Sequence, residues 1–359
     1  MKPHTFSNAI IKWFHLHGRH DLPWQKNQTP YRVWVSEIML QQTQVTTATP
    51  YYIKFMRRFP TVKSLALAGN DDVLAHWSGL GYYARARNLH KTAKIIHKNH
   101  AGRFPFSIEG LMELPGIGRS TAGAILSFSR KVYAPILDGN VKRVLTRCFA
   151  INGWPGDAKV LKKLWEYAET YTPQINTHHY NQALMDLGAT ICTRSKPKCN
   201  KCPLEKKCIA HLTQTETNYP TSKPKKSYPT KKVHALIIEH MDESFLLVKR
   251  PPIGIWGGLW TLPECTIDED PVVWCNEKLG LSVEYTLTLD KLYHKFSHFQ
   301  LEIHSILLKI TNTNNVLMDA QNQVWYKCGD RFPGGAPAPL EKIIMKYNIA
   351  KEEQALWPV

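Results

Sequence analysis

Four of the eight cysteines in this 359-residue chain lie in one short segment, and their spacing constrains the fold more than any other feature. They are Cys192, Cys199, Cys202 and Cys208, in a C-x6-C-x2-C-x5-C arrangement. Zinc and an iron–sulfur cluster both accept four thiolates. A zinc ribbon usually has two C-x2-C pairs, and only one is present here, so the spacing favours a cluster without excluding zinc. In a reducing compartment we expect the other four to be ordinary core residues. These are Cys148, Cys265, Cys275 and Cys328.

The composition is that of a basic globular protein. The formal net charge is +17, and clustered positive charge gains free energy by releasing the counterions condensed on a polyanion. DNA, RNA and an anionic membrane surface would all satisfy this charge. Apolar residues make up 43% of the chain, but no run is long enough to span a membrane and the first residues do not resemble a signal peptide. We therefore expect a cytoplasmic protein without a membrane span.

The chain changes character twice, which predicts two domains and a linker. In residues 1–212 apolar residues recur at helical spacing, as in Tyr31–Gln44 and Asp71–Trp77, which predicts an all-α domain. Residues 213–232 combine three prolines with five lysines, a composition typical of an extended linker. Short apolar segments bounded by turns then predict strands in an α+β domain at residues 233–353. The predicted strands are Val233–Ile238, Phe245–Lys249, Leu301–Ile310 and Val324–Tyr326.

The segment L-P-G-I-G at residues 114–118 lies between two apolar helical stretches and predicts a helix-hairpin-helix motif. Gly116 and Gly118 allow the backbone to approach a partner closely, and the amide groups that open the next helix can hold a phosphate. The alternative is a plain tight turn between packed helices.

Two carboxyl groups, Glu37 and Asp138, lie in sequence environments that favour different protonation states. Glu37 falls in an apolar helix, and burial there would raise its pKa and keep it protonated. Asp138 directly precedes a predicted helix, whose dipole would stabilise the ionised form. An acid and a carboxylate are the pair that cleavage of a glycosidic bond requires. The alternatives are a solvent-facing Glu37 and an Asp138 that only caps a helix.

Two other segments combine amides or aromatic rings with small residues, which suits entry into a stack of bases. They are Gln41-Gln42-Thr43 and residues 79–83, which include Leu80 and Tyr82. An enzyme that acts on a base in a duplex must flip it out, and inserted side chains fill the gap. Taken singly, Leu80 and Tyr82 are also typical core residues.

Together these motifs resemble the MutY family of adenine DNA glycosylases, in the helix-hairpin-helix superfamily that also includes endonuclease III. The resemblance covers nearly the whole chain. Its motifs are residues 22–24 (L-P-W), 35–37 (V-S-E), 39–45 (M-L-Q-Q-T-Q-V), 79–88, 114–123, 137–141 (L-D-G-N-V) and the four cysteines. It implies a 4Fe-4S cluster on the loop 192–208 and an adenine pocket between a six-helix barrel and the cluster domain. The implied partner is double-stranded DNA with an adenine:8-oxoguanine or adenine:guanine mispair.

The resemblance also implies roles for individual residues. The residue matching Glu37 protonates adenine at N7, the one matching Asp138 stabilises the oxocarbenium-like sugar, and Asn140 helps to position the reacting groups. Further residues are implied to contact DNA or a base. They are Trp24, Gln41, Gln42, Thr43, Leu80, Tyr82, Gly116, Gly118, Ser120, Gln182, Ser297 and His298.

One position separates two subclasses of this superfamily. Relatives that also cut the DNA backbone carry a nucleophilic lysine two residues after the second hairpin glycine, where this chain has Ser120. This favours a monofunctional glycosylase that uses water, although Lys142 lies close enough in sequence to Asp138 to trap the sugar weakly. The rival enzyme is a glycosylase/lyase for oxidised pyrimidines. The rival from another class is a DNA-binding protein without catalysis.

Residues 233–353 resemble the Nudix-like module with which MutY proteins recognise 8-oxoguanine. The segment G-G-L-W-T-L-P at 257–263 fits the entry to that fold. F-S-H-F at 296–299 matches the loop that touches oxidised guanine, with Ser297 and His298 as hydrogen-bonding residues. Residues 264–280 lack the R-E-x-x-E-E core that holds magnesium, so we do not expect nucleotide hydrolysis. We expect a monomer associated with the nucleoid.

Overall fold

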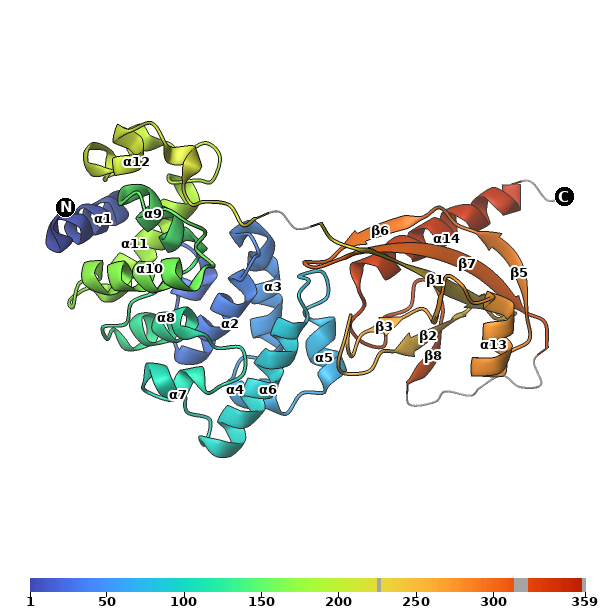
Figure 1. The fold of residues 1–359 in the computed structure, drawn as a ribbon. Coiled ribbons are helices and arrows are strands. Elements are labelled where there is room, and N and C mark those ends of the chain that lie inside the picture. Colours follow the sequence, from blue (N-terminus) through green and yellow to red (C-terminus); the bar gives the residue numbers. More distant parts are fainter. Residues whose placement is uncertain (225–226, 313–321, 357–359) are drawn as a thin grey trace. The chain divides into compact units, whose positions relative to one another are not determined.

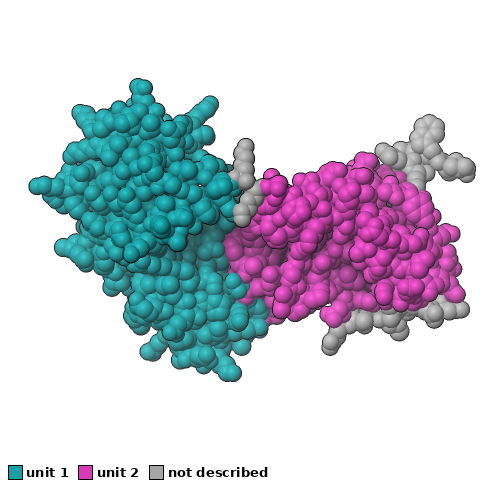
Figure 2. Space-filling model, in the orientation of Figure 1, with its two compact units in different colours: residues 1–67, 88–225 teal, residues 68–87, 226–359 magenta. Residues whose placement is uncertain are grey.

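The computed structural model describes residues 1–224, 227–312 and 322–356, and it divides into two compact units. Unit 1 comprises Met1–Leu67 and Asn88–Lys225, and unit 2 comprises Ala68–Arg87 and Lys226–Val359 (Figure 1; Figure 2). The short segment 68–87 therefore packs with the C-terminal residues, although helices of unit 1 flank it in the sequence. None of the described helices is long and apolar enough to cross a membrane.

Unit 1 is helical and contains no strand within its described residues, which confirms the all-α prediction. Large apolar side chains such as Trp34 and Phe55 are fully buried in its core. The α-helices are α1 (Pro3–His17), α2 (Pro30–Leu40), α3 (Val45–Arg58), α4 (Val62–Ala66), α6 (Ala84–Asn99, beginning in unit 2), α7 (Ile108–Met112), α8 (Arg119–Arg130), α9 (Gly139–Cys148), α10 (Ala158–Tyr171), α11 (Thr177–Thr190) and α12 (Ile209–Leu212). The 3-10 turns are η1 (Pro23–Gln25), η2 (Cys199–Lys201), η3 (Glu205–Lys207) and η4 (Glu216–Asn218).

Helix α2 ends earlier than its apolar pattern predicts, and the reason is a backbone turn. Thr29 caps the helix by accepting a hydrogen bond from the Arg32 amide (3.3 Å). At the other end, Gln42 has a left-handed backbone (φ 56°), which a right-handed helix does not include. The predicted extension to Gln44 is therefore wrong, and α2 ends at Leu40.

Helix α8 packs against the extended segment that leads to Asp138. A Cβ added to Gly123 of α8 would lie 2.4 Å from the Pro135 carbonyl oxygen, so only glycine allows this approach. The segment ends at Asp138, where α9 begins. Close packing at Gly123 therefore fixes the path of the chain into the start of α9.

Unit 2 contains an eight-stranded mixed sheet in the order β3-β2-β1-β7-β5, with β4, β6 and β8 paired onto β1, β7 and β2. Its central strands β1 (Thr230–Glu239) and β7 (Gln300–Ile310) are parallel, and β1 pairs with β7 along its whole length. The other strands are β2 (Phe245–Lys249), β3 (Trp260–Thr261), β4 (Glu264–Thr266), β5 (Val283–Thr288), β6 (Leu292–Lys295) and β8 (Gln323–Tyr326). The helices are α5 (Asn70–Ala75), α13 (Pro271–Leu279) and α14 (Ala338–Leu356).

The two faces of this sheet bury separate apolar cores. Successive side chains of a strand point to opposite faces, so Ile237 packs in one core with Leu340 of α14. Its neighbour Ile238 packs in the other core with Cys275 of α13. Figure 1 shows the two helices on opposite faces of the sheet, which confirms the predicted α+β architecture.

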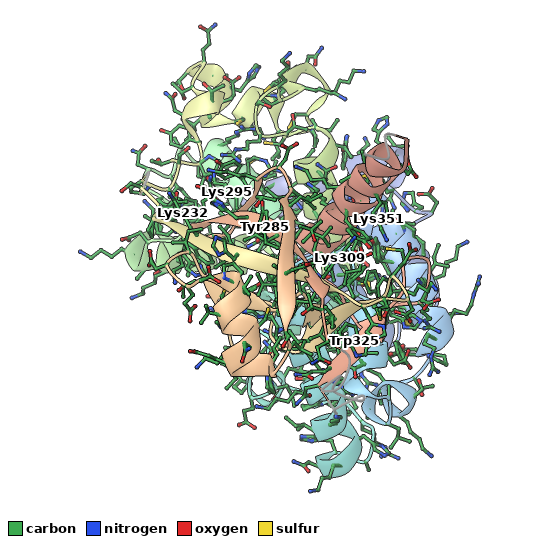
Figure 3. All side chains as sticks on the ribbon, turned by 90° about the vertical axis from the view of Figure 1, so that its right-hand side faces the viewer. Lys232, Tyr285, Lys295, Lys309, Trp325 and Lys351 are labelled. Carbon is green, nitrogen blue, oxygen red and sulfur yellow. The ribbon has the colours of Figure 1, made fainter. Side chains whose placement is uncertain are left out.

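The four predicted strands are present, but the prediction missed several elements. β1 begins at Thr230 rather than Val233, because its exposed first residues continue the ladder with β7. β3 to β6 were not predicted because they are short or exposed. Tyr285 of the edge strand β5, labelled in Figure 3, is 57% exposed. Lys225 and Lys226 of the predicted linker lie outside the described residues, and the domain limits stay predictions.

The scattered cysteines largely follow the prediction. Cys148, Cys265 and Cys275 are buried, as expected of core residues. Cys328 differs because it is only partly buried, and its thiol donates to Asn348 Oδ1 (3.2 Å).

We expect Gly123→Ala to lower the free energy of unfolding by about 1–3 kcal/mol, because the new Cβ overlaps the Pro135 carbonyl and α8 must move. Gly139→Ala is the matched control, since a Cβ there meets nothing within 4 Å. Chemical unfolding of both variants measures the difference. Equal stability of the two would contradict the close packing of α8.

Candidate active site and cysteine site

A cavity of about 1090 Å³ opens in unit 1 and draws its lining from α2, α8, α9 and α11. Many of the residues singled out in the sequence line this cavity. They are Trp24, Glu37, Gln41, Gln42, Thr43, Ser120, Asp138, Asn140 and Gln182. The lining does not include the hairpin glycines Gly116 and Gly118. Four other singled-out residues belong to unit 2, namely Leu80, Tyr82, Ser297 and His298.

Glu37 is a carboxyl group that the cavity wall keeps protonated. It lies on α2 between the buried residues Ser36 and Ile38 and is itself only partly exposed. Burial, and secondarily the negative charge of Asp138, raises the pKa of Glu37 to about 8. At neutral pH its side chain is therefore a proton donor in the cavity.

Asp138 is the N-cap of α9, and its carboxylate is hydrogen-bonded. Oδ1 accepts a hydrogen bond from the Val141 amide (2.8 Å), and Oδ2 accepts one from Asn140 Nδ2 (3.0 Å). Burial raises the pKa of Asp138, while these two hydrogen bonds and the charge of Arg143 act in the opposite direction. Capping and stabilisation of the ionised form are thus two effects of the same contacts.

Arg143 connects this carboxylate to the cysteine segment. Its Nη2 donates to Asn140 Oδ1 (2.9 Å) and to the Gly188 carbonyl of α11 (2.6 Å). Its Nε donates to the Cys192 carbonyl (2.7 Å). A continuous chain of hydrogen bonds therefore runs from Asp138 through Asn140 and Arg143 to the first of the four cysteines.

Ser120 holds the residue that precedes Asp138. Its Oγ accepts a hydrogen bond from the Leu137 amide (3.0 Å), and the side chain lines the cavity. The position at which the sequence resemblance implies a lysine in the lyases of the superfamily thus holds a hydroxyl group with a backbone partner.

Sequence reasoning missed an ion pair in the wall of the cavity. Asp186, which is fully buried, accepts hydrogen bonds from the Arg19 amide (2.7 Å), from Arg19 Nη2 (2.6 Å) and from Gln182 Nε2 (3.0 Å). Arg19 and Gln182 both line the cavity. No motif marks Arg19 or Asp186, and 167 residues separate them, so the sequence held no signal for this contact.

The hairpin between α7 and α8 has the predicted form. Gly116 has a left-handed backbone (φ 80°), and a Cβ there would lie 2.9 Å from Asn88 Cβ. Gly118 is the N-cap of α8 and is exposed. The first amides of α8 thus begin at a surface turn, as a helix-hairpin-helix motif requires.

The segments expected to enter DNA have unusual backbones. Gln42 (φ 56°) and Tyr82 (φ 48°) are both left-handed without being glycine, a conformation that is rare and costly elsewhere. Gln41 and Gln42 are exposed, and Thr43 is partly exposed. Tyr82 is 57% exposed, whereas Leu80 is buried.

Ser297 and His298 lie at the tip of the hairpin between β6 and β7. Both are exposed, and Ser297 Oγ lies 3.2 Å from His298 Nδ1. They stand between Phe296 and Phe299, whose rings stack with centroids 4.4 Å apart. Lys295, labelled in Figure 3, ends β6 directly before this tip.

The four clustered cysteines line one small cavity of unit 1, as their spacing predicts. The buried Arg147 of α9 donates to Cys192 Sγ (3.4 Å) and to the carbonyls of Thr193 (2.7 Å) and Arg194 (2.8 Å). This guanidinium ties the cysteine segment to α9. Five lysines in the segment are exposed and make its surface basic. They are Lys196, Lys198, Lys201, Lys206 and Lys207.

A second group of metal-binding side chains adjoins the cysteines. Ligand atoms of Cys199, His211 and Glu216 lie within 4.8 Å of one another. Glu216 Oε1 already accepts a hydrogen bond from Cys199 Sγ (3.6 Å) and lies 2.6 Å from His211 Nδ1. Glu216 is therefore a hydrogen-bonding neighbour of Cys199, His211 is hydrogen-bonded to Glu216, and the four thiols form the larger set.

Comparison with known proteins decides the family. Residues 35–170 match the model of the HhH-GPD superfamily of base excision DNA repair proteins, and residues 234–346 match the NUDIX domain. Over 97% of its length this chain is 44% identical to an adenine DNA glycosylase of Buchnera aphidicola, of which it covers 99%. The chain belongs to the adenine DNA glycosylase family. It is also 32% identical to the human adenine DNA glycosylase, over 96% of this chain and 74% of the relative.

Solved structures share the fold of the helical part of this chain. A thermostable thymine-DNA glycosylase matches with a TM-score of 0.52 and 27% identity, covering 59% of this chain and 97% of the other. A trapped endonuclease III–DNA intermediate matches with a TM-score of 0.50 at 19% identity, covering 60% and 99%. The two family models and the curated relatives confirm the family resemblance seen in the motifs, the enzyme class and the succession of a helical part and a Nudix-like part.

We expect Glu37→Gln to stabilise the protein increasingly as pH rises from 5 to about 8, with no further gain above that. In the wild type the folded state holds a proton that the unfolded chain releases above the ordinary carboxyl value of 4.5, so stability is lost up to the folded pKa. Glutamine lacks this loss. The gain in melting temperature should be on the order of 5 °C, measured by thermal unfolding at several pH values. A pH-independent difference would contradict the raised pKa.

Proposed function

We propose that this chain hydrolyses the glycosidic bond of adenine in duplex DNA where the adenine is mispaired with 8-oxoguanine or guanine. The observation that carries the proposal is the pair of carboxyl groups in one cavity. Glu37 has a pKa raised to about 8, and the ionised form of Asp138 is supported by hydrogen bonds. The adenine DNA glycosylase relatives support adenine as the base that is released.

In the proposed reaction the C1′–N9 bond breaks and its electron pair leaves with the adenine ring. The proton of Glu37 passes to adenine N7, so the base departs as a neutral molecule. The carboxylate of Asp138 faces the positive charge that develops on the sugar. A water molecule then adds to C1′, and its proton returns to the Glu37 carboxylate. Asn140 keeps Asp138 in place through the hydrogen bond to Oδ2.

Gln182 and Trp24 are the residues that we assign to the flipped adenine. Gln182 donates its amide nitrogen to Asp186, so its carbonyl oxygen is left as an acceptor, which suits the exocyclic amino group of adenine. Trp24 is nearly buried and packs edge-on against Tyr52, with ring centroids 5.5 Å apart. Its ring gives the cavity an apolar wall against which a base can stack.

We assign a second set of residues to contact the base opposite adenine and to fill the gap that the flipped adenine leaves in the stack. Gln42 and Tyr82 are supported in this role by their exposed side chains and left-handed backbones. Ser297 and His298 are supported by their exposure at the hairpin tip. The full set is Gln41, Gln42, Thr43, Leu80, Tyr82, Ser297 and His298.

The DNA backbone is assigned to the hairpin and to the basic cysteine segment. Gly116 and Gly118 leave the amides at the start of α8 open to a phosphate. The exposed lysines of the cysteine segment add sequence-independent attraction through counterion release. Double-stranded DNA is therefore the partner that the charge and the motifs together favour.

The proposed enzyme is monofunctional, with water as the nucleophile. Ser120 offers a hydroxyl group that already accepts the Leu137 amide, not an amine that could form a Schiff base. Lys142 remains the residue that could trap the sugar weakly, because burial lowers its pKa while Asp138 acts in the opposite direction. The pyrimidine-specific lyase is disfavoured on the same residue, Ser120.

The four cysteines fit a 4Fe-4S cluster, as in the resembling family. Their thiols line one cavity and provide the four sulfur ligands that such clusters take, and Arg147 donates to Cys192 Sγ as a hydrogen-bonding neighbour. When bound, the cluster would supply four iron–sulfur bonds that cross-link the segment. This chain's own contribution is the basic surface that the segment then presents.

Two other assignments belong to the proposal. The NUDIX-matching part recognises oxidised guanine rather than hydrolysing nucleotides, since residues 264–280 lack the magnesium-binding glutamates. A cytoplasmic, nucleoid-associated monomer remains our expectation. A DNA-binding protein without catalysis is the second candidate, and the retention of both Glu37 and Asp138 in one cavity disfavours it.

We expect the wild-type protein to release adenine from a duplex with an adenine:8-oxoguanine pair and to leave strands that break only after hot alkali. Glu37→Gln and Asp138→Asn should bind the same duplex within a few-fold of wild type, yet release adenine at least about 1,000-fold more slowly, because each lacks one half of the acid and carboxylate pair. Single-turnover cleavage assays with binding titrations measure both quantities.

Ser120→Lys is the companion variant for the monofunctional mechanism. It should introduce strand breaks without alkali and form a borohydride-trapped adduct. Tight binding without release by the wild type would favour the second candidate. Alkali-independent breaks by the wild type would contradict the use of water.

We expect loss of the cluster to weaken DNA binding by about tenfold or more while the helical core stays folded, because the basic segment depends on the four ligands. Oxidative removal followed by iron analysis, circular dichroism and DNA titration tests this. Cluster-free protein that binds the duplex with unchanged affinity would refute it.

A further inference from the structure

The segment 68–87 provides an observation that the proposed function does not use. It lies within the region matched by the HhH-GPD superfamily, yet it packs in unit 2 with the C-terminal sheet (Figure 2). It contains α5 and the loop 78–83, which carries Tyr82. The question is what holds this loop in its shape.

Two backbone carbonyls of the C-terminal residues accept hydrogen bonds from side chains of the segment 68–87. The Ala336 carbonyl accepts hydrogen bonds from Tyr83 OH (2.6 Å) and from Ser78 Oγ (3.0 Å). The Gly257 carbonyl accepts one from Arg87 Nη1 (2.9 Å). Ser78 and Tyr83 are the two ends of the loop, so both ends are bound to one acceptor.

Close packing supports these hydrogen bonds. A Cβ on Gly335, next to Ala336, would lie 2.9 Å from Leu74 Cβ of α5, so the two backbones meet without space for a side chain. Lys249 Nζ of β2 forms an ion pair with Asp71 Oδ2 of α5 (2.7 Å). The C-terminal residues therefore pack closely against α5 and the loop.

The loop also closes on itself around Tyr82. Trp77 Nε1 donates to the Gly81 carbonyl (3.1 Å), and Arg85 Nη2 donates to the Leu80 carbonyl (3.1 Å). The Arg85 guanidinium lies 5.5 Å from the centroid of the Tyr82 ring. These contacts hold Tyr82 in its left-handed conformation (φ 48°), with its side chain 57% exposed.

We propose that Tyr83 and Arg87 are positioning residues through which the C-terminal residues of unit 2 fix the Tyr82 loop for its contact with the base opposite adenine. The inference rests on the proposed function for its assignment of Tyr82 to that base. The C-terminal residues thereby influence the choice of opposite base in two ways, through their own hairpin tip and through a loop that lies in sequence within the HhH-GPD match. Neither Tyr83 nor Arg87 contacts the reacting atoms in this scheme.

The physical reason is that a left-handed tyrosine is retained only where its surroundings determine its backbone. Removing the Tyr83 hydroxyl takes away the shorter of the two hydrogen bonds to Ala336 and lets the loop relax from this conformation. With a relaxed loop the protein would still release adenine, but it would no longer favour 8-oxoguanine over guanine as the opposite base to the same extent.

The test compares single-turnover adenine release from duplexes with 8-oxoguanine or guanine opposite adenine. We expect Tyr83→Phe and Arg87→Met each to reduce the ratio of the rate opposite 8-oxoguanine to the rate opposite guanine by about 5- to 10-fold. The melting temperature of each variant should stay close to that of the wild type. Tyr171→Phe is the matched control, because it also removes a tyrosine hydroxyl bound to a carbonyl, that of Met1 (2.9 Å), at an exposed site of unit 1. The control should leave the ratio unchanged.

A double-mutant cycle distinguishes positioning from general stability. If Tyr83 acts through Tyr82, Tyr83→Phe should change the ratio little in a Tyr82→Ala background, so the two effects should not multiply. Ser78→Ala, which removes the weaker bond to the same carbonyl, provides a second variant if Tyr83→Phe folds poorly. It should shift the ratio in the same direction by a smaller factor.

Each outcome bears on a different statement. A wild-type ratio in Tyr83→Phe and Arg87→Met, or effects that multiply with Tyr82→Ala, would overturn the positioning role. Failure of the wild type to release adenine would instead overturn the proposed function. A normal ratio in Tyr82→Ala would remove the role of Tyr82 and the inference with it, while leaving adenine release intact.

Discussion

The carboxylate of Asp138 accepts the Val141 amide and the Asn140 side chain, and these two hydrogen bonds fix the first turn of α9. One turn later, Arg143 binds the carbonyls of Gly188 and Cys192. The start of α9 therefore links the carboxylate of the cavity, the neighbouring helix α11 and the cysteine segment. A shift in any of them would break hydrogen bonds in the others, so the geometry of the site depends on this turn.

The same turn explains how two carboxyl groups in one cavity differ in behaviour. Burial raises the pKa of both Glu37 and Asp138, so burial alone favours the protonated form of both carboxyl groups. Only Asp138 has backbone and side-chain donors that oppose this effect, whereas the second influence on Glu37 is the negative charge of Asp138 itself. Stabilising one carboxylate therefore helps to keep the proton on the other. The start of α9 thus supports the ionised form of Asp138 and, through the charge of Asp138, contributes to the raised pKa of Glu37.

The sequence predicted those parts of the site whose members are close together in the chain. Asp138 and Asn140 belong to one motif, the four cysteines lie in one segment, and both groups meet in space as their spacing indicates. Contacts between residues that are distant in sequence and belong to no motif could not be predicted, as with Arg19 and Asp186. The end of α2 was misplaced because apolar spacing does not report the left-handed backbone of Gln42. β5 was missed because residues such as Tyr285 are exposed and do not alternate.

Left-handed backbones and the contacts that support them occur together at two positions of this fold. Gln42 and Tyr82 both have left-handed backbones. Each such conformation costs about 1–3 kcal/mol and is kept only where the surrounding structure supports it. At Gln42 the support is local, since the Thr43 amide donates to the Leu40 carbonyl (3.2 Å) at the end of α2. At Tyr82 it comes from Ala336, which is remote in sequence. A glycosylase core that carried the same loop without the C-terminal residues would lose that acceptor. The second domain thus contributes to the conformation of the first domain's own sequence, in addition to any contact that it makes itself.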